Sequence, residues 1–173
     1  MGIARSVPQE RRRATRVDRL ERPSPCGARR RRNPDCRVIV VKISGSCHCG
    51  AIAYEAEIDP ARVVVCHCCD CQKLTGSAYR VSVGTRRSQL VVHRGKPTLY
   101  VKGADSGAKR AQEFCPCCGS PLFTYDLQNP EKVGLRVGCI DQRSELRPSK
   151  QVWRRSALAW SSCLAHLPSQ EQE

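Results

Sequence analysis

The sequence predicts a mainly β fold, and three observations favour this fold class. Short runs of β-branched and aromatic residues recur along most of the chain. Glycine, proline, asparagine and aspartate, which are typical of turns, separate these runs. Seven of the thirteen cysteines have the spacings C-x-C, C-x-C-x-x-C and C-x-x-C, which are typical of metal-binding turns.

The predicted strands are short and follow one another closely. The first, 38–43, is a β-branched run, and the second, 51–57, alternates through Ile52, Tyr54 and Ala56. The remaining strands are predicted at 63–65, 78–83, 90–93, 99–101, 121–125 and 133–137. Turn signals between the strands lie at 84–85, 94–97, 105–107 and 129–130. We expect one helical turn at 69–75, before Gly76, and a weak terminal helix at 154–166.

Positive charge is concentrated at the start of the chain, which has 173 residues and a net charge of +14. Residues 1–37 hold twelve arginines, four acidic residues and four prolines, with few large apolar side chains. This segment cannot bury enough surface to offset its chain entropy, so we expect 1–37 to be a disordered basic extension. Residues 38–168 then form one compact domain, and 169–173 a polar C-terminal tail.

The sequence favours a cytoplasmic location without a membrane partner. No stretch approaches the roughly 18 apolar residues of a membrane span. The N-terminus lacks the apolar segment of a secretory signal, and Glu10, Asp18 and Glu21 argue against a mitochondrial presequence. We therefore expect the cysteines to be reduced thiols and metal ligands rather than disulfides.

The C-x-C and C-x-x-C clusters together predict one closed zinc site. Zinc binds four thiolates tetrahedrally, and two cysteines on one tight turn can supply two of them. Glycine follows Cys49 and Cys118, where the turn benefits from a residue without a Cβ atom. This favours Cys118 over Cys117 as the partner of Cys115. The predicted ligands of this structural zinc are Cys47, Cys49, Cys115 and Cys118.

The middle cluster offers three thiolates for a second metal, from Cys66, Cys68 and Cys71. In one interpretation, His67, Cys69 or a distant side chain closes a second structural site. In the other, the fourth position stays open to water or a substrate thiol, as in a catalytic zinc site. The spacing alone does not distinguish them. We expect His67 and His48 to orient ligands rather than to bind metal.

The arginine runs at 11–13 and 29–32 favour a different kind of partner. Such runs can contact nucleic-acid phosphates through charge alone. Residues 1–37 contain no aromatic side chain that could stack on bases, so any nucleic-acid binding through this extension would be nonspecific. We favour a solvated extension over a nucleic-acid-binding one.

Several motifs occur in a family-specific order. Gly-Ser-Cys-His-Cys-Gly-Ala stands at 45–51, and Cys-His-Cys-Cys-Asp-Cys-Gln-Lys-Leu-Thr-Gly-Ser-Ala-Tyr at 66–79. Phe-Cys-Pro-Cys-Cys-Gly-Ser-Pro-Leu follows at 114–122, and Gly-Cys-Ile-Asp at 138–141. Together these motifs resemble the glutathione-dependent formaldehyde-activating enzyme / centromere protein V family over residues 43–168.

The resemblance implies a fold, two metals and an activity. The fold would be Mss4-like, with short twisted antiparallel sheets clamped by zinc knuckles. Two zinc ions per chain are implied: the four cysteines above match the structural ligands, and Cys66, Cys68 and Cys71 match the catalytic ones, which favours the open site. The implied activity is that of a carbon–sulfur lyase, resembling S-(hydroxymethyl)glutathione synthase. Its substrates would be glutathione or a similar thiol and formaldehyde or another small aldehyde.

Two residues beside these motifs bear on the substrate. Lys73 could meet a carboxylate of glutathione, or it could be an ordinary solvated lysine. Gln151 stands where the family often has a histidine, so a role of that histidine does not carry over. The alternative function is a noncatalytic zinc-binding module whose basic extension contacts nucleic acid.

Overall fold

The computed structural model describes residues 39–103 and 107–172. The chain divides into two units, Met1–Cys36 and Arg37–Glu173, and all described residues belong to the second. The predicted disordered extension, 1–37, lies outside the described residues, as do positions 105 and 106 of one predicted turn. The boundaries at 38–168 and 169–173 stay predictions.

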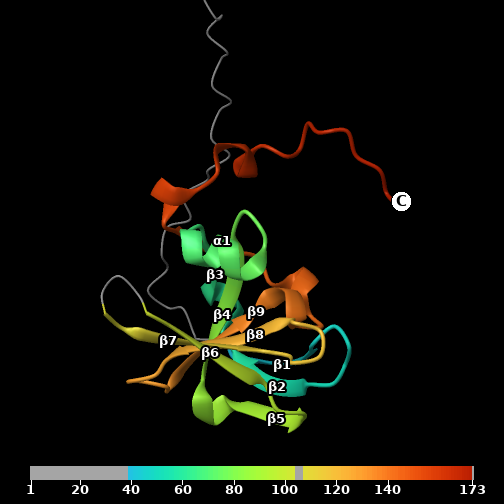
Figure 1. The fold of residues 1–173 in the computed structure, drawn as a ribbon. Coiled ribbons are helices and arrows are strands. Elements are labelled where there is room, and N and C mark those ends of the chain that lie inside the picture. The colour runs from blue at the N-terminus through green and yellow to red at the C-terminus, as the bar shows by residue number, and fades with distance from the viewer. Residues whose placement is uncertain (1–38, 104–106, 173) are drawn as a thin grey trace, which may run out of the picture. The chain divides into compact units, whose positions relative to one another are not determined.

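Ten strands form two sheets in the described part of the chain (Figure 1). The smaller sheet is antiparallel, and its order is β1 (Val41–Ser46), β2 (Ala53–Ile58) and β5 (Leu90–Arg94). The order of the larger sheet is β10 (Lys150–Val152), β3 (Val63–Cys66), β4 (Arg80–Arg86), β9 (Lys132–Arg136), β8 (Pro121–Asp126), β7 (Lys109–Phe114) and β6 (Thr98–Gly103). Its strand pairs are antiparallel except β10 with β3, which are parallel. The mainly β fold class is therefore confirmed.

The helix α1 (Cys69–Thr75) begins just after β3 and confirms the predicted helical turn (Figure 1). It ends at Gly76, which is left-handed with φ 59°, a conformation that glycine adopts without strain. No helix among residues 39–103 and 107–172 is long and apolar enough to cross a membrane. Short 3₁₀ turns occupy Pro60–Arg62, Arg87–Gln89, Val137–Cys139, Arg143–Glu145, Arg154–Ser156 and Ala159–Ser162.

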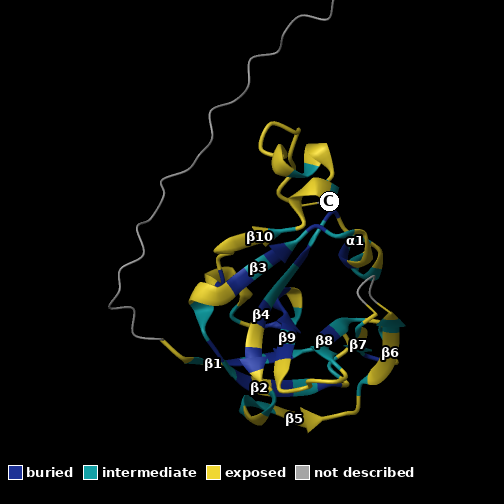
Figure 2. Cartoon of the chain, turned by 90° about the vertical axis from the view of Figure 1, so that its left-hand side faces the viewer, coloured by how far each residue is buried: buried dark blue, intermediate teal, exposed yellow. Residues whose placement is uncertain are grey.

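The predicted terminal helix at 154–166 is wrong, because only two of these 3₁₀ turns lie there. Serine hydroxyls in the segment bond nearby carbonyls: Ser161 Oγ donates to Leu158 O at 2.7 Å, and Ser162 Oγ donates to Ala159 O. Such local bonds compete with a regular helix. Much of the segment is also exposed, so it lacks the buried face that stabilises a short helix (Figure 2).

The sequence prediction also misses two strands and misplaces one turn. The sequence of β7 is Lys-Arg-Ala-Gln-Glu-Phe, in which Ala111 and Gln112 are buried. Its charged residues are not typical of a strand, so the sequence does not predict one here. β10 has only three residues and depends on its pairing with β3. The predicted turn at 84–85 lies inside β4, where Gly84 pairs with Gly134 of β9.

The core contains side chains from both sheets. Ile43, Ile52 and Tyr54 come from the smaller sheet and its β1–β2 turn, and they join Leu122 and Phe123 of β8. The Tyr54 and Phe123 rings meet edge to face with centroids 4.9 Å apart, a favourable aromatic geometry. Figure 2 shows buried residues on strands of both sheets, among them β2, β3, β4 and β9.

Gly45 provides a test of packing at the core. A Cβ atom there would lie 2.5 Å from Tyr54 Oη, which donates a hydrogen bond to the Cys139 carbonyl, and would also meet that carbonyl. We expect Gly45→Ala to lower the free energy of unfolding by about 1–3 kcal/mol, measured by urea denaturation. Gly84→Ala is the matched control, because nothing lies within 4 Å of its added Cβ. Equal stability of the two variants would contradict this account.

Candidate metal centres

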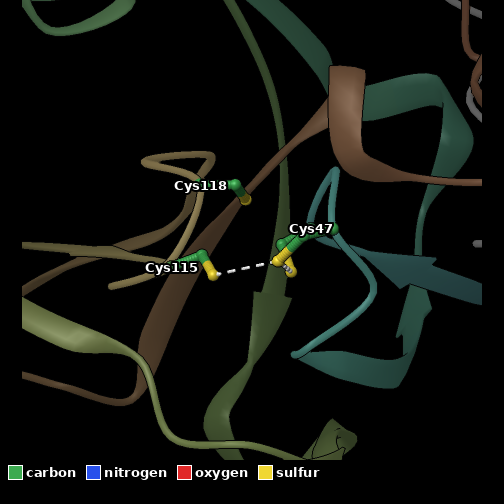
Figure 3. A group of neighbouring side chains, drawn as sticks. Cys47, Cys115 and Cys118 are labelled. Atoms are coloured by element: carbon green, nitrogen blue, oxygen red, sulfur yellow. Dashed lines mark hydrogen bonds between the residues drawn. The ribbon is translucent and has the colours of Figure 1, made fainter.

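The first group of thiols joins turns from the two sheets. Cys47 and Cys49 lie in the β1–β2 turn, whereas Cys115 and Cys118 lie in the β7–β8 turn. Their four Sγ atoms all lie within 4.8 Å of one another, so the structure brings together the four thiols singled out in the sequence. Figure 3 shows Cys47, Cys115 and Cys118 gathered at this point.

Glycines and backbone amides shape both turns. Gly50 and Gly119 each have φ of 72°, a left-handed conformation that favours glycine directly after the second thiol. The Ile52 amide donates to Cys47 Sγ at 3.2 Å. Such amide bonds stabilise the charged form of sulfur, which is the form that binds metal.

The sulfur spacing fits a tetrahedral zinc. Zinc–sulfur bonds of about 2.3 Å would place any two ligand sulfurs about 3.8 Å apart. The Sγ atoms of Cys47 and Cys49 are 3.6 Å apart, and those of Cys49 and Cys115 are 3.7 Å apart. The donor set and its dimensions therefore suit a closed four-thiolate site.

The Cys118 thiol of this group is shifted toward its charged form. Hydrogen bonds from the hydroxyl and backbone amide of Ser120 lower the pKa of Cys118 to about 5. The two side chains are 3.2 Å apart. By contrast, Cys117 and His48 are exposed and lie outside the group. The backbone amide of His48 donates to Ser120 Oγ, which ties the two turns together.

The second group of thiols is formed by one continuous segment. Cys66 ends β3, Cys68 is the N-cap of α1, and Cys71 is buried in its first turn. Their Sγ atoms lie within 4.8 Å of one another, and those of Cys66 and Cys68 are 3.6 Å apart. Three thiols suited to one metal are thus brought together, as the spacing predicts.

Local bonds hold this segment in place. Cys68 Sγ accepts a hydrogen bond from the Cys71 amide at 3.4 Å, as an N-cap side chain does. Burial raises the pKa of the Cys66 thiol to about 12, and the neighbouring Cys71 acts in the same direction. A metal bound here must displace that proton, so metal affinity should fall as the pH is lowered.

The other polar side chains near this cluster lie outside the thiol group. Cys69 and Lys73 are exposed on α1. The predicted contact of Lys73 with glutathione therefore stays a prediction. His67 is buried, and its Nε2 lies 2.9 Å from Gln151 Oε1. Gln151 thus meets the histidine that stands between two of the thiols.

Arg80 is a site residue that the sequence analysis misses. Its Nη2 and Nε donate to Cys71 Sγ at 2.8 and 3.2 Å, and its side chain is buried. Its Nη1 donates to Gln112 Oε1 on β7, which also accepts from Arg136 Nη2 on β9. A lone arginine inside the predicted strand at 78–83 is the one sequence signal for this role. Its partners lie on distant strands and leave no signal in the spacing.

The strands β3 and β4 separate two cavities. Because side chains alternate across a strand, Val65 of β3 and Val81 of β4 line a cavity of about 570 Å³ together with His67, whereas Arg80 faces the other way. The second cavity, of about 240 Å³, is lined by Leu74, Arg80, Tyr100, Gln112, Glu113, Phe114, Gly119 and Pro121. Arg80 connects the smaller cavity to Cys71, so that cavity lies on the side of the thiols.

Comparisons with known proteins identify similar sequences and a similar fold. The sequence model of the family described as glutathione-dependent formaldehyde-activating enzyme matches residues 42–156, which include both thiol groups. A curated protein of Halomonas elongata, named as a candidate enzyme of that description, is 32% identical over 115 residues, or 64% of this chain and 72% of that protein. The crystal structure of a Rhodobacter sphaeroides protein is 28% identical with a TM-score of 0.51, and the match covers 62% of this chain and 98% of that chain.

From the geometry of the first thiol group we expect a bound metal that stabilises the fold. We expect the wild type to bind two zinc ions and Cys115→Ser to bind one, as measured by elemental analysis. Unfolding of this variant should need several kcal/mol less, because structural zinc contributes about 10–16 kcal/mol in isolated zinc-finger peptides.

The neighbouring thiol supplies the control for this experiment. Cys117→Ser changes an exposed cysteine in the same turn, so it should retain both zinc ions and the wild-type stability. The assignment of the four ligands fails if Cys117→Ser loses zinc or if Cys115→Ser keeps it.

Proposed function

Since the chain belongs to the glutathione-dependent formaldehyde-activating enzyme family, we propose that it is a zinc-dependent carbon–sulfur lyase. Its reaction would join the sulfur of glutathione, or of a similar thiol, to the carbon of formaldehyde or another small aldehyde. The reverse reaction would release the aldehyde. The thiol proton ends on the aldehyde oxygen, so the addition needs no oxidant or reductant.

The observation that carries this proposal is the difference between the two thiol groups. The first offers four sulfurs, which is a complete set for a structural zinc. The second offers three, and within the described residues Arg80 rather than a fourth metal ligand contacts Cys71. Three protein ligands with an open position are typical of catalytic zinc. The second group is therefore the proposed active site.

Cys66, Cys68 and Cys71 would hold the catalytic zinc, and Cys47, Cys49, Cys115 and Cys118 the structural one. When bound there, zinc would favour the thiolate form of a thiol near neutral pH. The thiolate is the nucleophile that adds to a carbonyl carbon.

Protein side chains would supply the remaining requirements of the site. The cavity of about 240 Å³ has room for an aldehyde and the thiol end of a larger molecule. Leu74 and Phe114 line it with apolar groups, which limits access of water. Arg80 holds the orientation of Cys71 through two hydrogen bonds to its sulfur. Side chains that hydrogen-bond to a metal ligand commonly orient that ligand in this way.

The test is catalysis of adduct formation. We expect wild-type protein loaded with zinc to accelerate exchange between ¹³C-formaldehyde and its glutathione adduct, as followed by NMR. Cys68→Ser should lower this acceleration by more than about 100-fold, because even changes behind a metal ligand cost about 10–100-fold. Cys69→Ser is the matched control, since Cys69 is exposed and outside the thiol group, and it should keep the wild-type rate.

Two results would contradict the proposal. One is a wild type that binds two zinc ions and leaves the exchange rate unchanged for glutathione and other small thiols. The other is a Cys68→Ser variant that has lost one zinc ion and retains full activity. The first result would favour a noncatalytic zinc-binding module, whose partner would then be sought through residues 1–37.

A further inference from the structure

Two buried arginines, Arg80 and Arg136, share one hydrogen-bond acceptor beside the second thiol group. Arg80 is 8% exposed and Arg136 is 5% exposed, so both charges are shielded from water. Gln112 Oε1 lies between them and accepts from Arg80 Nη1 at 3.1 Å and from Arg136 Nη2 at 2.8 Å. Burying two like charges this close is costly unless negative charge lies nearby.

No carboxylate in residues 39–103 and 107–172 supplies that negative charge through an ion pair. Among the residues that the structure describes, neither arginine forms an ion pair. The nearby acidic residues are already engaged: Asp70 pairs with Lys102, and Glu113 accepts a hydrogen bond from Tyr125 Oη. Arg136 donates further to Ser82 Oγ, a neutral group, and its Nε has no partner in the described part of the chain.

Gln112 shows that the residue between the two arginines is neutral. A glutamate at that position would reach both guanidinium groups and cancel one of the charges. The amide instead accepts two hydrogen bonds without adding charge, and its Nε2 donates to Thr124 Oγ1 at 3.0 Å. The positive charge is thus left for the thiolates, the nearest of which is Cys71, in contact with Arg80.

Adding up the formal charges at the second site gives a net charge of about +1. With zinc bound as in the proposed function, the divalent cation and two guanidinium groups exceed three thiolates by one positive charge. A neutral fourth ligand would leave this charge uncompensated in a buried site. An anionic fourth ligand would cancel it. Buried charge interactions are strong enough for this difference to decide which ligand is preferred.

We infer that the Arg80–Gln112–Arg136 cluster makes the open position of the second site selective for an anionic thiolate over a neutral ligand. The inference deepens the proposed function and rests on it for the bound metal. Arg80 and Arg136 act in it as positioning residues through their charge, and Gln112 acts by staying neutral between them. The cavity lined by Arg80 and Gln112 lies next to this cluster and would give a thiol an approach along Arg80 toward Cys71.

Gln112→Glu tests the inference with little change in shape. The variant keeps both arginines and adds one negative charge. The Thr124 hydroxyl donates to the Ala111 carbonyl, so it would exchange that hydrogen bond for one to the new carboxylate. The full chain would be loaded with cobalt(II), whose absorption spectrum reports a change of ligand. Binding of 2-mercaptoethanol, which binds as an anion, would be compared with binding of imidazole, which binds as a neutral ligand.

We expect Gln112→Glu to weaken binding of 2-mercaptoethanol about tenfold, as for one charge about 10 Å away at an effective dielectric constant of about 20. Imidazole affinity should stay within about twofold, because its binding changes no charge at the site. Arg136→Met removes one positive charge without touching a thiol and should have the same selective effect. Arg86→Met is the matched control, since Arg86 is exposed at the far end of β4, and it should change neither affinity.

Three outcomes would overturn the inference. Thiolate affinity could be unchanged in both charge variants, or thiolate and imidazole affinities could fall together, as expected for a general loss of structure. Failure of cobalt to occupy the second site would overturn it as well. The exchange assay with formaldehyde is measured separately. Selective loss of thiolate binding in a protein without turnover would keep this inference and reject the proposed function, whereas turnover with unchanged selectivity would do the reverse.

Discussion

The contact between two turns from different sheets is the constraint on which the rest of this structure depends. Cys47 and Cys115 are members of the hydrophobic core as well as of the first thiol group, so this thiol group and the core form one packed unit. The domain is small, and a small core by itself provides limited stability. A metal that fixes the β1–β2 turn against the β7–β8 turn would hold Tyr54 against Phe123 and keep the two sheets in register.

The parts of the site that could be predicted from the sequence are those set by local geometry. A cysteine pair followed by glycine specifies its own turn, and Gly50 and Gly119 have the left-handed conformation that this requires. The helical turn at 69–75 is likewise encoded by its neighbours, because the Cys68 thiol caps it and Gly76 ends it. Most strands can be predicted for the same reason, because they are runs of residues that suit a half-buried sheet.

The parts that could not be predicted depend on contacts between distant residues. Arg80 and Gln112 are 32 positions apart, and no spacing rule relates an arginine on β4 to a glutamine on β7. The composition of β7 gives little indication of a strand. Its strand conformation depends on pairing with β6 and β8 on either side. The prediction for the terminal segment is wrong for a different reason. The composition of 154–166 permits a helix, but most of the segment is exposed, so it lacks the buried face that would stabilise a helix.

The two thiol groups also differ in how much of the chain must be present before they form. Cys66 to Cys71 lie within one short segment, so the second group can assemble as soon as that segment has left the ribosome. The first group joins Cys49 to Cys115, 66 positions later, and closing so long a loop costs more entropy. During synthesis, the proposed catalytic metal would therefore be captured first, and the proposed structural metal would close the fold only after the β7–β8 turn has emerged.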